Sequence, residues 1–127
     1  MILVDTSVWI EHLRHGDDVL AGLLDTERVL VHPFVTGELA LGNMRDHAVI
    51  FNAIMELPQA TIVHHDEVLH FINQEALSGS GIGYVDAHLL AAVRLMPGTS
   101  LWTRDRRLYE AARKLGLASV LPGKLLH

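Results

Sequence analysis

Four acidic residues stand out in this chain because the local pattern gives no structural reason for a charge at their positions. Asp5 and Asp105 each end a short apolar run, whereas Glu38 and Asp86 share a helical face with apolar side chains. A carboxylate at the edge of an apolar core is costly unless it takes up a proton or finds a cation. Four such carboxylates that converge without a basic partner indicate a divalent metal site.

Magnesium or manganese is the expected ion, because hard cations prefer oxygen ligands and keep waters that a substrate can displace. The chain has no cysteine, which removes thiolate ligands and disulfides. It has two lysines, Lys114 and Lys124, and neither lies near a predicted strand end. A cluster of this kind suits phosphodiester hydrolysis, in which the ion lowers the pKa of the attacking water and stabilises the leaving oxygen.

The elements that must position these acids alternate along the chain between short apolar strands and amphipathic helices. This pattern is typical of a parallel sheet covered by helices on both faces. The expected strands are 2–4, 29–31, 61–63, 100–102 and 119–121. The expected helices are 6–13, 18–24, 33–41, 45–55, 66–79, 84–95 and 105–115. We therefore predict one α/β domain over residues 1–127, with a mostly parallel sheet of about four to five strands and about seven helices.

Such a fold would bring the acids together. Ligands of open parallel sheets bind outside the carboxyl ends of the strands, which places Asp5 and Asp105 in one crevice. Helical spacing only makes it reasonable that Glu38 and Asp86 join them. Simpler roles remain open, because Asp5 and Asp105 could each cap a helix and the two helical acids could face solvent.

Four stretches of the sequence together resemble the PIN-domain ribonucleases, and more narrowly the VapC toxins of bacterial type II toxin-antitoxin modules. They read MILVDTSVWIEHLR, FVTGELALG, GIGYVDAHLLAA and LWTRDRRLYEAARKLGL and span nearly the whole chain. By match of motif, the resemblance implies that Asp5, Glu38, Asp86 and Asp105 bind Mg²⁺ or Mn²⁺ for RNA cleavage. Asp5 and Asp86 would be direct ligands, while Glu38 and Asp105 would shape the site or hold a second ion.

The resemblance also implies roles for hydroxyl groups and arginines near these acids. The hydroxyls of Thr6, Ser7 and Thr103 would fix a carboxylate or hold a water, although Thr6 and Ser7 could equally cap the first long helix. The candidate RNA-binding residues are Arg104, Arg106, Arg107 and Arg14. For these arginines, ordinary solvated charges at a helix surface are an equal alternative.

Charge and hydropathy set the remaining limits. The net charge of −5 argues against a general nucleic-acid binder, but the four special acids account for most of it, so RNA is not excluded. The N-terminus lacks the basic segment of a secretory signal, and no apolar run approaches the roughly 18 residues that span a membrane. We expect a cytoplasmic protein without a membrane segment.

Other sites and functions are weaker alternatives. Closely spaced histidines such as His64 and His65 suggest zinc, but no third ligand is indicated. The glycine-rich segment 78–83 lacks the lysine of a phosphate-binding P-loop. A phosphotransfer domain also places an acid after its first strand, yet the phosphatase pattern has a second acid where this chain has Ser7. A non-catalytic RNA- or protein-binding domain on the same fold would have no use for four acids.

The resemblance further implies partners. A VapB-like antitoxin would insert a helix or an extended segment into a groove and block the acidic site with a basic side chain. Trp9, Ile10 and Leu13 could line that groove or belong to the core. A homodimer is also implied. The RNA that would be cut, transfer RNA or ribosomal RNA for example, cannot be deduced from the sequence.

Overall fold

The structure, a computed structural model, describes residues 1–121. The elements in chain order are β1 (Ile2–Val4), α1 (Thr6–His15), α2 (Asp18–Asp25), β2 (Val29–Leu30), α3 (Pro33–Ala40), α4 (His47–Met55), α5 (His65–Gln74), α6 (Tyr84–Leu95), β3 (Ser100–Trp102) and α7 (Arg106–Lys114). Lys124 and the predicted domain boundary at residue 127 lie outside the described residues.

β1 is the central strand of a three-stranded parallel sheet with the order β2-β1-β3. Ile2 pairs with Val29 on one side and with Ser100 on the other. The side chains of β1 and β2 are all buried, as expected for a parallel sheet with helices on both faces. Because the strands are parallel, Asp5 after β1 and Thr103 after β3 emerge at the same edge of the sheet.

The sheet is smaller than the four to five strands that the sequence predicted. Segment 61–63 forms no strand, and pairing beside β2 is limited to one bridge between Val31 and Gln59. Segment 119–121 also forms no strand, and Ala118 alone bridges to β3. The existing strands are too short to pair with further strands. α3 begins two residues after Val31, and β3 ends one residue after Leu101, which forms the bridge to Ala118. Each edge therefore has a single residue left to pair.

Seven helices lie within the described residues, as predicted, and six of them agree with the expected ranges to within two residues. The exception is α5, which ends at Gln74 and not near residue 79. Ala76 adopts a left-handed conformation with φ of 53°, and the Leu77 N–H returns to the Ile72 carbonyl at 3.0 Å. This backbone turn closes the helix early without the glycine that usually marks such an end.

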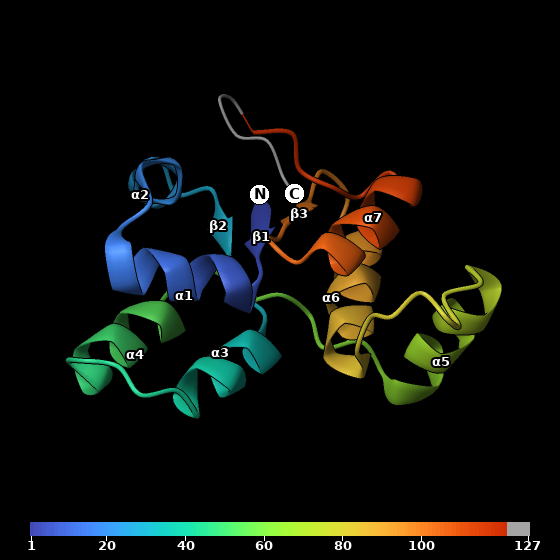
Figure 1. Ribbon diagram of the computed structural model, residues 1–127, viewed down its shortest axis with the longest axis horizontal. Helices are drawn as coiled ribbons and strands as arrows, with labels where there is room; N and C mark the ends of the chain where they lie inside the picture. Colours follow the sequence, from blue (N-terminus) through green and yellow to red (C-terminus); the bar gives the residue numbers. More distant parts are fainter. Residues whose placement is uncertain (122–127) are drawn as a thin grey trace.

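The helices form two groups around the strands. Figure 1 shows α1 to α4 on one side of the sheet and α5 to α7 on the other. The side chains between them form one apolar core, in which Trp102 of β3 is the largest fully buried residue. No helix in residues 1–121 is both long and apolar enough to cross a membrane.

A buried aromatic cluster supports the edge of the sheet beyond β2. His32 is fully buried, caps α3 by accepting a hydrogen bond from the Phe34 N–H at 3.0 Å, and packs edge-on against the Phe34 ring. His88 of α6 contacts both rings from the other side of the sheet. Burial, with a smaller contribution from His88, lowers the pKa of His32 from 6.5 to about 4.

This histidine should make the protein sensitive to acid. Because the pKa of His32 is lower in the folded state, the unfolded chain binds the proton more readily between pH 6.5 and about 4. The free energy of unfolding should therefore decrease as the pH is lowered from 6.5 to about 4, by on the order of 2 to 3 kcal/mol from this group. His32→Asn keeps a neutral capping side chain, and urea unfolding at pH 7 and pH 4 should show a smaller loss. An unchanged loss in this variant would count against the assignment.

Candidate active site

Asp5 is the most rigidly held of the four acids. Its side chain is buried, and its Oδ2 accepts hydrogen bonds from Ser7 Oγ and Thr103 Oγ1, both at 2.8 Å. Asp5 occupies the N-cap position of α1, but its carboxylate makes no capping hydrogen bond. The capping alternative for Asp5 is therefore wrong. Two hydroxyls fix the carboxylate at the carboxyl end of β1, while its Oδ1 has no hydrogen-bond partner in residues 1–121.

Thr103 and Ser7 connect the ends of β1 and β3. Thr103 is fully buried, and its Oγ1 also accepts a hydrogen bond from the Asp105 N–H at 3.0 Å. Ser7 Oγ accepts from the Arg104 N–H at 3.0 Å. Neither hydroxyl caps α1. Both instead tie the backbone after β3 to the Asp5 carboxylate, a positioning role of the kind that outer-shell groups have around metal ligands.

Thr6 makes the corresponding contact to the second acid. Thr6 Oγ1 donates a hydrogen bond of 2.6 Å to Glu38 Oε1, which joins the start of α1 to the exposed face of α3. The two helices pack side by side, as Figure 1 also shows. Glu38 is thus an exposed residue, but it is held toward the N-terminus of α1 and not simply solvated. Its other oxygen makes no hydrogen bond to the described residues.

Asp86 shows that the four acids influence one another. It is half-buried in the first turn of α6, where its Oδ2 accepts a hydrogen bond from the Gly83 N–H at 3.1 Å. Burial raises the pKa of Asp86, the bond to Gly83 opposes this increase, and the negative charges of Asp5, Asp105 and Glu38 add to it. The charges of Asp5, Asp105 and Glu38 therefore all act on Asp86, which supports a shared acidic region.

Asp105 has two roles in this structure. It is the N-cap of α7, and its Oδ1 accepts a hydrogen bond from the Leu108 N–H at 3.0 Å. The capping alternative is therefore correct for Asp105. The cap uses one oxygen, and the exposed side chain leaves the other oxygen without a hydrogen bond in the described part of the chain. A carboxylate fixed in this way still contributes its charge to the shared region, as the pKa of Asp86 shows.

The donor set fits a hard divalent cation. All four groups are carboxylates, they repel one another, and none forms an ion pair within residues 1–121. In the same residues, no three of these side chains lie close enough to enclose one ion as they stand. A closed cage is not required, because Mg²⁺ is usually bound by one or two carboxylates and keeps several waters.

Burial of Asp86, together with the charges of the other three acids, should destabilise the metal-free protein. Because the pKa of Asp86 is raised in the folded state, its ionised form opposes folding at neutral pH. Asp86→Asn should therefore raise the melting temperature in EDTA, since the amide oxygen can still accept from Gly83. Mn²⁺ should raise the melting temperature of the wild type and have little effect on the variant. Equal stabilisation of both proteins by Mn²⁺ would argue against Asp86 as a ligand.

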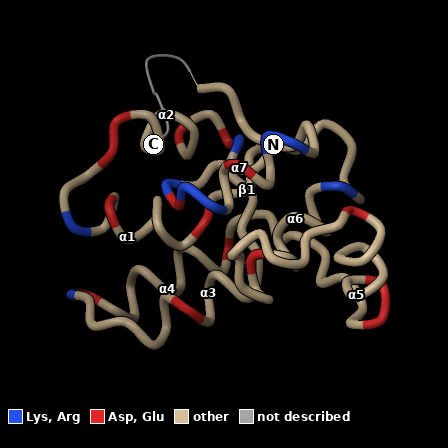
Figure 2. The backbone as a smooth tube through the Cα atoms, turned by 45° about the vertical axis from the view of Figure 1, so that its right-hand side comes forward, with Lys and Arg blue, Asp and Glu red and all other residues tan. Residues whose placement is uncertain are grey.

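The four candidate RNA-binding arginines differ in their surroundings. Arg104 Nη2 makes an ion pair of 2.6 Å with Asp17 Oδ2, and the Asp17 side chain is almost fully buried. Arg104 thus anchors the start of α2, a structural role that its place beside Asp105 did not predict. Arg106 and Arg107 are exposed in the first turn of α7 and form no ion pair in residues 1–121. Figure 2 shows basic and acidic segments close together around α7 and β1.

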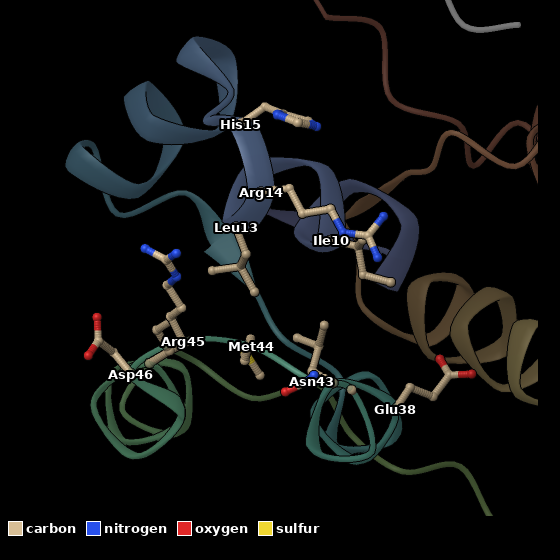
Figure 3. A pocket seen from close by; sticks show the side chains of 12 residues that line it. Ile10, Leu13, Arg14, His15, Glu38, Asn43, Met44, Arg45 and Asp46 are labelled. Atoms are coloured by element: carbon tan, nitrogen blue, oxygen red, sulfur yellow. The ribbon is translucent and has the colours of Figure 1, made fainter.

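Arg14 lines an open groove that lies between α1, α3 and the segment leading into α4. The groove has a volume of about 720 Å³. Figure 3 shows Ile10 and Leu13 of α1 facing Met44, with Glu38 at one end. Trp9 is buried in the core, whereas its neighbours Ile10 and Leu13 line the groove, so the two alternatives for this segment are each correct in part.

Several residues with clear roles were not singled out by their sequence pattern. Asp17 caps α2 by accepting a hydrogen bond from the Leu20 N–H at 3.0 Å. Its pairing with Arg104 spans 87 positions and leaves no local signal in the sequence. His12 and His64 each accept a backbone hydrogen bond through Nδ1. His65 is hydrogen-bonded to the Tyr84 hydroxyl.

Comparison with known proteins agrees with this geometry. Residues 2–114 match the family model of the PIN domain. The chain is also 48% identical over 118 residues to two proteins named Ribonuclease VapC32, from Mycobacterium tuberculosis strains CDC 1551 / Oshkosh and ATCC 25618 / H37Rv. Each alignment covers 93% of this chain and 95% of the relative. The chain therefore belongs to the PIN-domain family and, within it, to the VapC ribonucleases.

Proposed function

We propose that this protein is a metal-dependent endoribonuclease that acts as the toxin of a toxin-antitoxin pair. The observation that supports the proposal is that the negative charges of Asp5, Glu38 and Asp105 all act on the half-buried carboxylate of Asp86, where they add to burial in raising its pKa. No described cation balances them. Similarity to proteins named as ribonucleases supports RNA as the substrate.

Each acid has a distinct part in the proposed reaction. Asp5 and Asp86 would hold Mg²⁺ or Mn²⁺ directly, since Asp5 is fixed by two hydroxyls and Asp86 by the N–H of Gly83. Glu38 and Asp105 would orient waters or hold a second ion from the rim. A bound ion would supply a water of lowered pKa and would stabilise the charge on the leaving oxygen.

The hydroxyls and arginines complete the proposed site. Thr103 and Ser7 keep Asp5 in one orientation, so that little reorganisation is needed when RNA binds. Arg106 and Arg107 offer unpaired positive charge for the phosphates of the substrate. Arg14 offers a further charge from the groove beside Glu38. Structured RNA such as transfer or ribosomal RNA, read in its single-stranded loops, is the proposed target, and the cytoplasm is the proposed location.

Purified protein incubated with total cellular RNA tests this function. With Mn²⁺ or Mg²⁺ present, sequencing of the cleaved ends should show discrete cuts, and EDTA should abolish them. RNA that remains intact in all conditions, in a preparation proven free of antitoxin, would instead support a non-catalytic RNA- or protein-binding domain. Light scattering of the same sample tests the proposed homodimer, and limited proteolysis tests whether residues 1–127 form one domain.

The groove between α1, α3 and α4 is the proposed seat of a VapB-like antitoxin. Ile10 and Leu13 present apolar surface there, and Glu38 places one end of the groove at the acidic site, where a basic side chain of the partner would be attracted.

Ile10→Glu should weaken capture of the co-expressed antitoxin by about 10-fold or more, because it places an unpaired charge against the apolar segment of the partner. Leu69→Glu, at an exposed apolar position on α5, is the matched control and should leave capture unchanged. The two proteins should cleave RNA equally. Equal loss of capture in both variants, or in neither, would place the antitoxin elsewhere.

A further inference from the structure

Arg107 lies against the glycine-rich loop that joins α5 to α6. A Cβ atom built on Gly81 would lie 2.7 Å from Arg107 Cδ and 3.2 Å from both Nε and Nη1. Real Cβ atoms essentially never approach another heavy atom within 3.0 Å, so no larger residue fits at position 81 while Arg107 keeps this position. Gly81 also has φ of +86°, a conformation that side chains other than glycine rarely adopt. The loop is therefore shaped to accept the arginine.

This contact lies beside two of the four acids. Gly81 precedes Gly83, whose N–H holds the Asp86 carboxylate, by two residues. Arg107 follows Asp105 by two residues in the first turn of α7. The contact thus joins the N-terminal ends of α6 and α7, each of which carries one acid of the site.

The charge of Arg107 is available to a ligand. The side chain is exposed, and it forms no ion pair or hydrogen bond in residues 1–121. Arg104, three residues earlier, is instead paired with the buried Asp17. An arginine held at the rim of an acidic site without a carboxylate partner is well suited to a phosphate, which it can contact through two parallel N–H groups.

We propose that Gly81 is a positioning residue. Because it has no side chain, it leaves room for Arg107 at the rim of the acidic site, where the arginine can contact a phosphate of the bound RNA. The inference deepens the proposed ribonuclease function and rests on it. The glycine-rich segment then contributes to substrate binding because it leaves space for the Arg107 side chain. It is not only a flexible connection between helices.

Gly79 provides a matched control in the same loop. It has φ of +81°, close to that of Gly81, but a Cβ atom there would meet no atom within 4 Å. Gly79→Ala and Gly81→Ala therefore impose similar backbone strain, of about 1 kcal/mol, and comparable losses in melting temperature. Only Gly81→Ala displaces Arg107, which can move away because it is a flexible side chain. A difference in RNA binding between the two variants thus reports on Arg107 and not on the loop.

The experiment measures binding of a fluorescent single-stranded RNA in EDTA at several salt concentrations, and the KM and kcat of cleavage in Mn²⁺. Gly81→Ala and Arg107→Ala should each weaken binding and raise KM by about 10-fold, with a smaller effect on kcat, because a phosphate contact mainly contributes to binding. The dependence of log K on log salt concentration should become shallower by up to about 0.7 in both variants. Gly79→Ala should match the wild type in all of these values.

The double variant Gly81→Ala/Arg107→Ala decides whether the two residues act together. If Gly81 acts through Arg107, the double variant should bind RNA no more weakly than Arg107→Ala alone. Additive losses, or equal effects of Gly79→Ala and Gly81→Ala, would overturn the inference while leaving the ribonuclease proposal intact. A wild-type protein that neither binds nor cleaves RNA would overturn both.

Discussion

Asp5→Asn should lower the rate of RNA cleavage by about 100-fold or more while leaving the fold intact. The substitution removes one negative charge from a buried group whose proposed part is to hold the ion, and such charge stabilisation is worth several kcal/mol in the transition state. The asparagine oxygen can still accept the hydrogen bonds of Ser7 and Thr103. The loss should therefore appear in kcat, measured on a defined RNA oligonucleotide with saturating Mn²⁺.

A charge-matched control separates this effect from a general change in electrostatics. Asp25→Asn removes the same charge from the exposed end of α2, where no hydrogen bond or ion pair of the side chain is found in residues 1–121. Its cleavage rate should match the wild type. Asp5→Asn should also keep the wild-type circular dichroism spectrum. Full activity in Asp5→Asn would show that Asp5 is not part of the catalytic site.

Trp102→Ala should have the largest effect on stability among single substitutions in the sheet. Trp102 is fully buried in β3 and pairs with Val4 of β1, so its truncation leaves a cavity at the centre of the fold. Loss of a buried tryptophan side chain costs about 3 to 5 kcal/mol. For a chain of this size, the melting temperature should fall by roughly 10 °C or more.

Trp102→Phe is the comparison that identifies the cause. Within residues 1–121, the indole Nε1 of Trp102 is buried without a hydrogen-bond partner, so phenylalanine removes an unsatisfied donor and keeps most of the packing. Urea unfolding should show a loss of about half or less of that found for alanine. Similar losses in both variants would mean that the indole ring itself, and not buried volume, stabilises this position.

The fold could be predicted from the sequence where local signals are strong. Short apolar runs bounded by polar residues predicted the three strands of the sheet, and capping residues and glycines predicted six helices closely. The signals failed at the sheet edges, because a run such as 61–63 has the composition of a strand but no partner left to pair with. They failed again at the end of α5, where the left-handed turn falls on Ala76, a residue type that gives no warning.

The site could be predicted in part, for a physical reason. Asp5 follows a strand, and parallel strands end at one edge, so its place depends on topology alone. The positions of Glu38 and Asp86 depend on how helices pack, which spacing along the chain does not determine. The hydroxyl of Thr103 reaches Asp5 across 98 positions. Gly81 likewise accepts Arg107 from a different part of the chain, across two separate elements. Contacts of this kind arise only in the folded chain.

The four acids also illustrate a cost of function. Burial raises the pKa of Asp86, repulsion from the other three acids adds to this increase, and both oppose folding in the absence of a cation. A site that only stabilised the fold would have included a basic residue, but the nearby Arg104 is paired with Asp17. Strain of this kind is expected where a protein retains charge for a ligand.

Calorimetric titration of Mn²⁺ into the metal-free protein tests the central claim most directly, because it requires neither the RNA target nor the antitoxin. The wild type should bind Mn²⁺, Asp5→Asn and Asp86→Asn should bind it at least about 10-fold more weakly, and Asp25→Asn should bind it as the wild type does. Equal affinity in all four proteins, or no binding by the wild type, would contradict a metal site at the carboxyl ends of the strands.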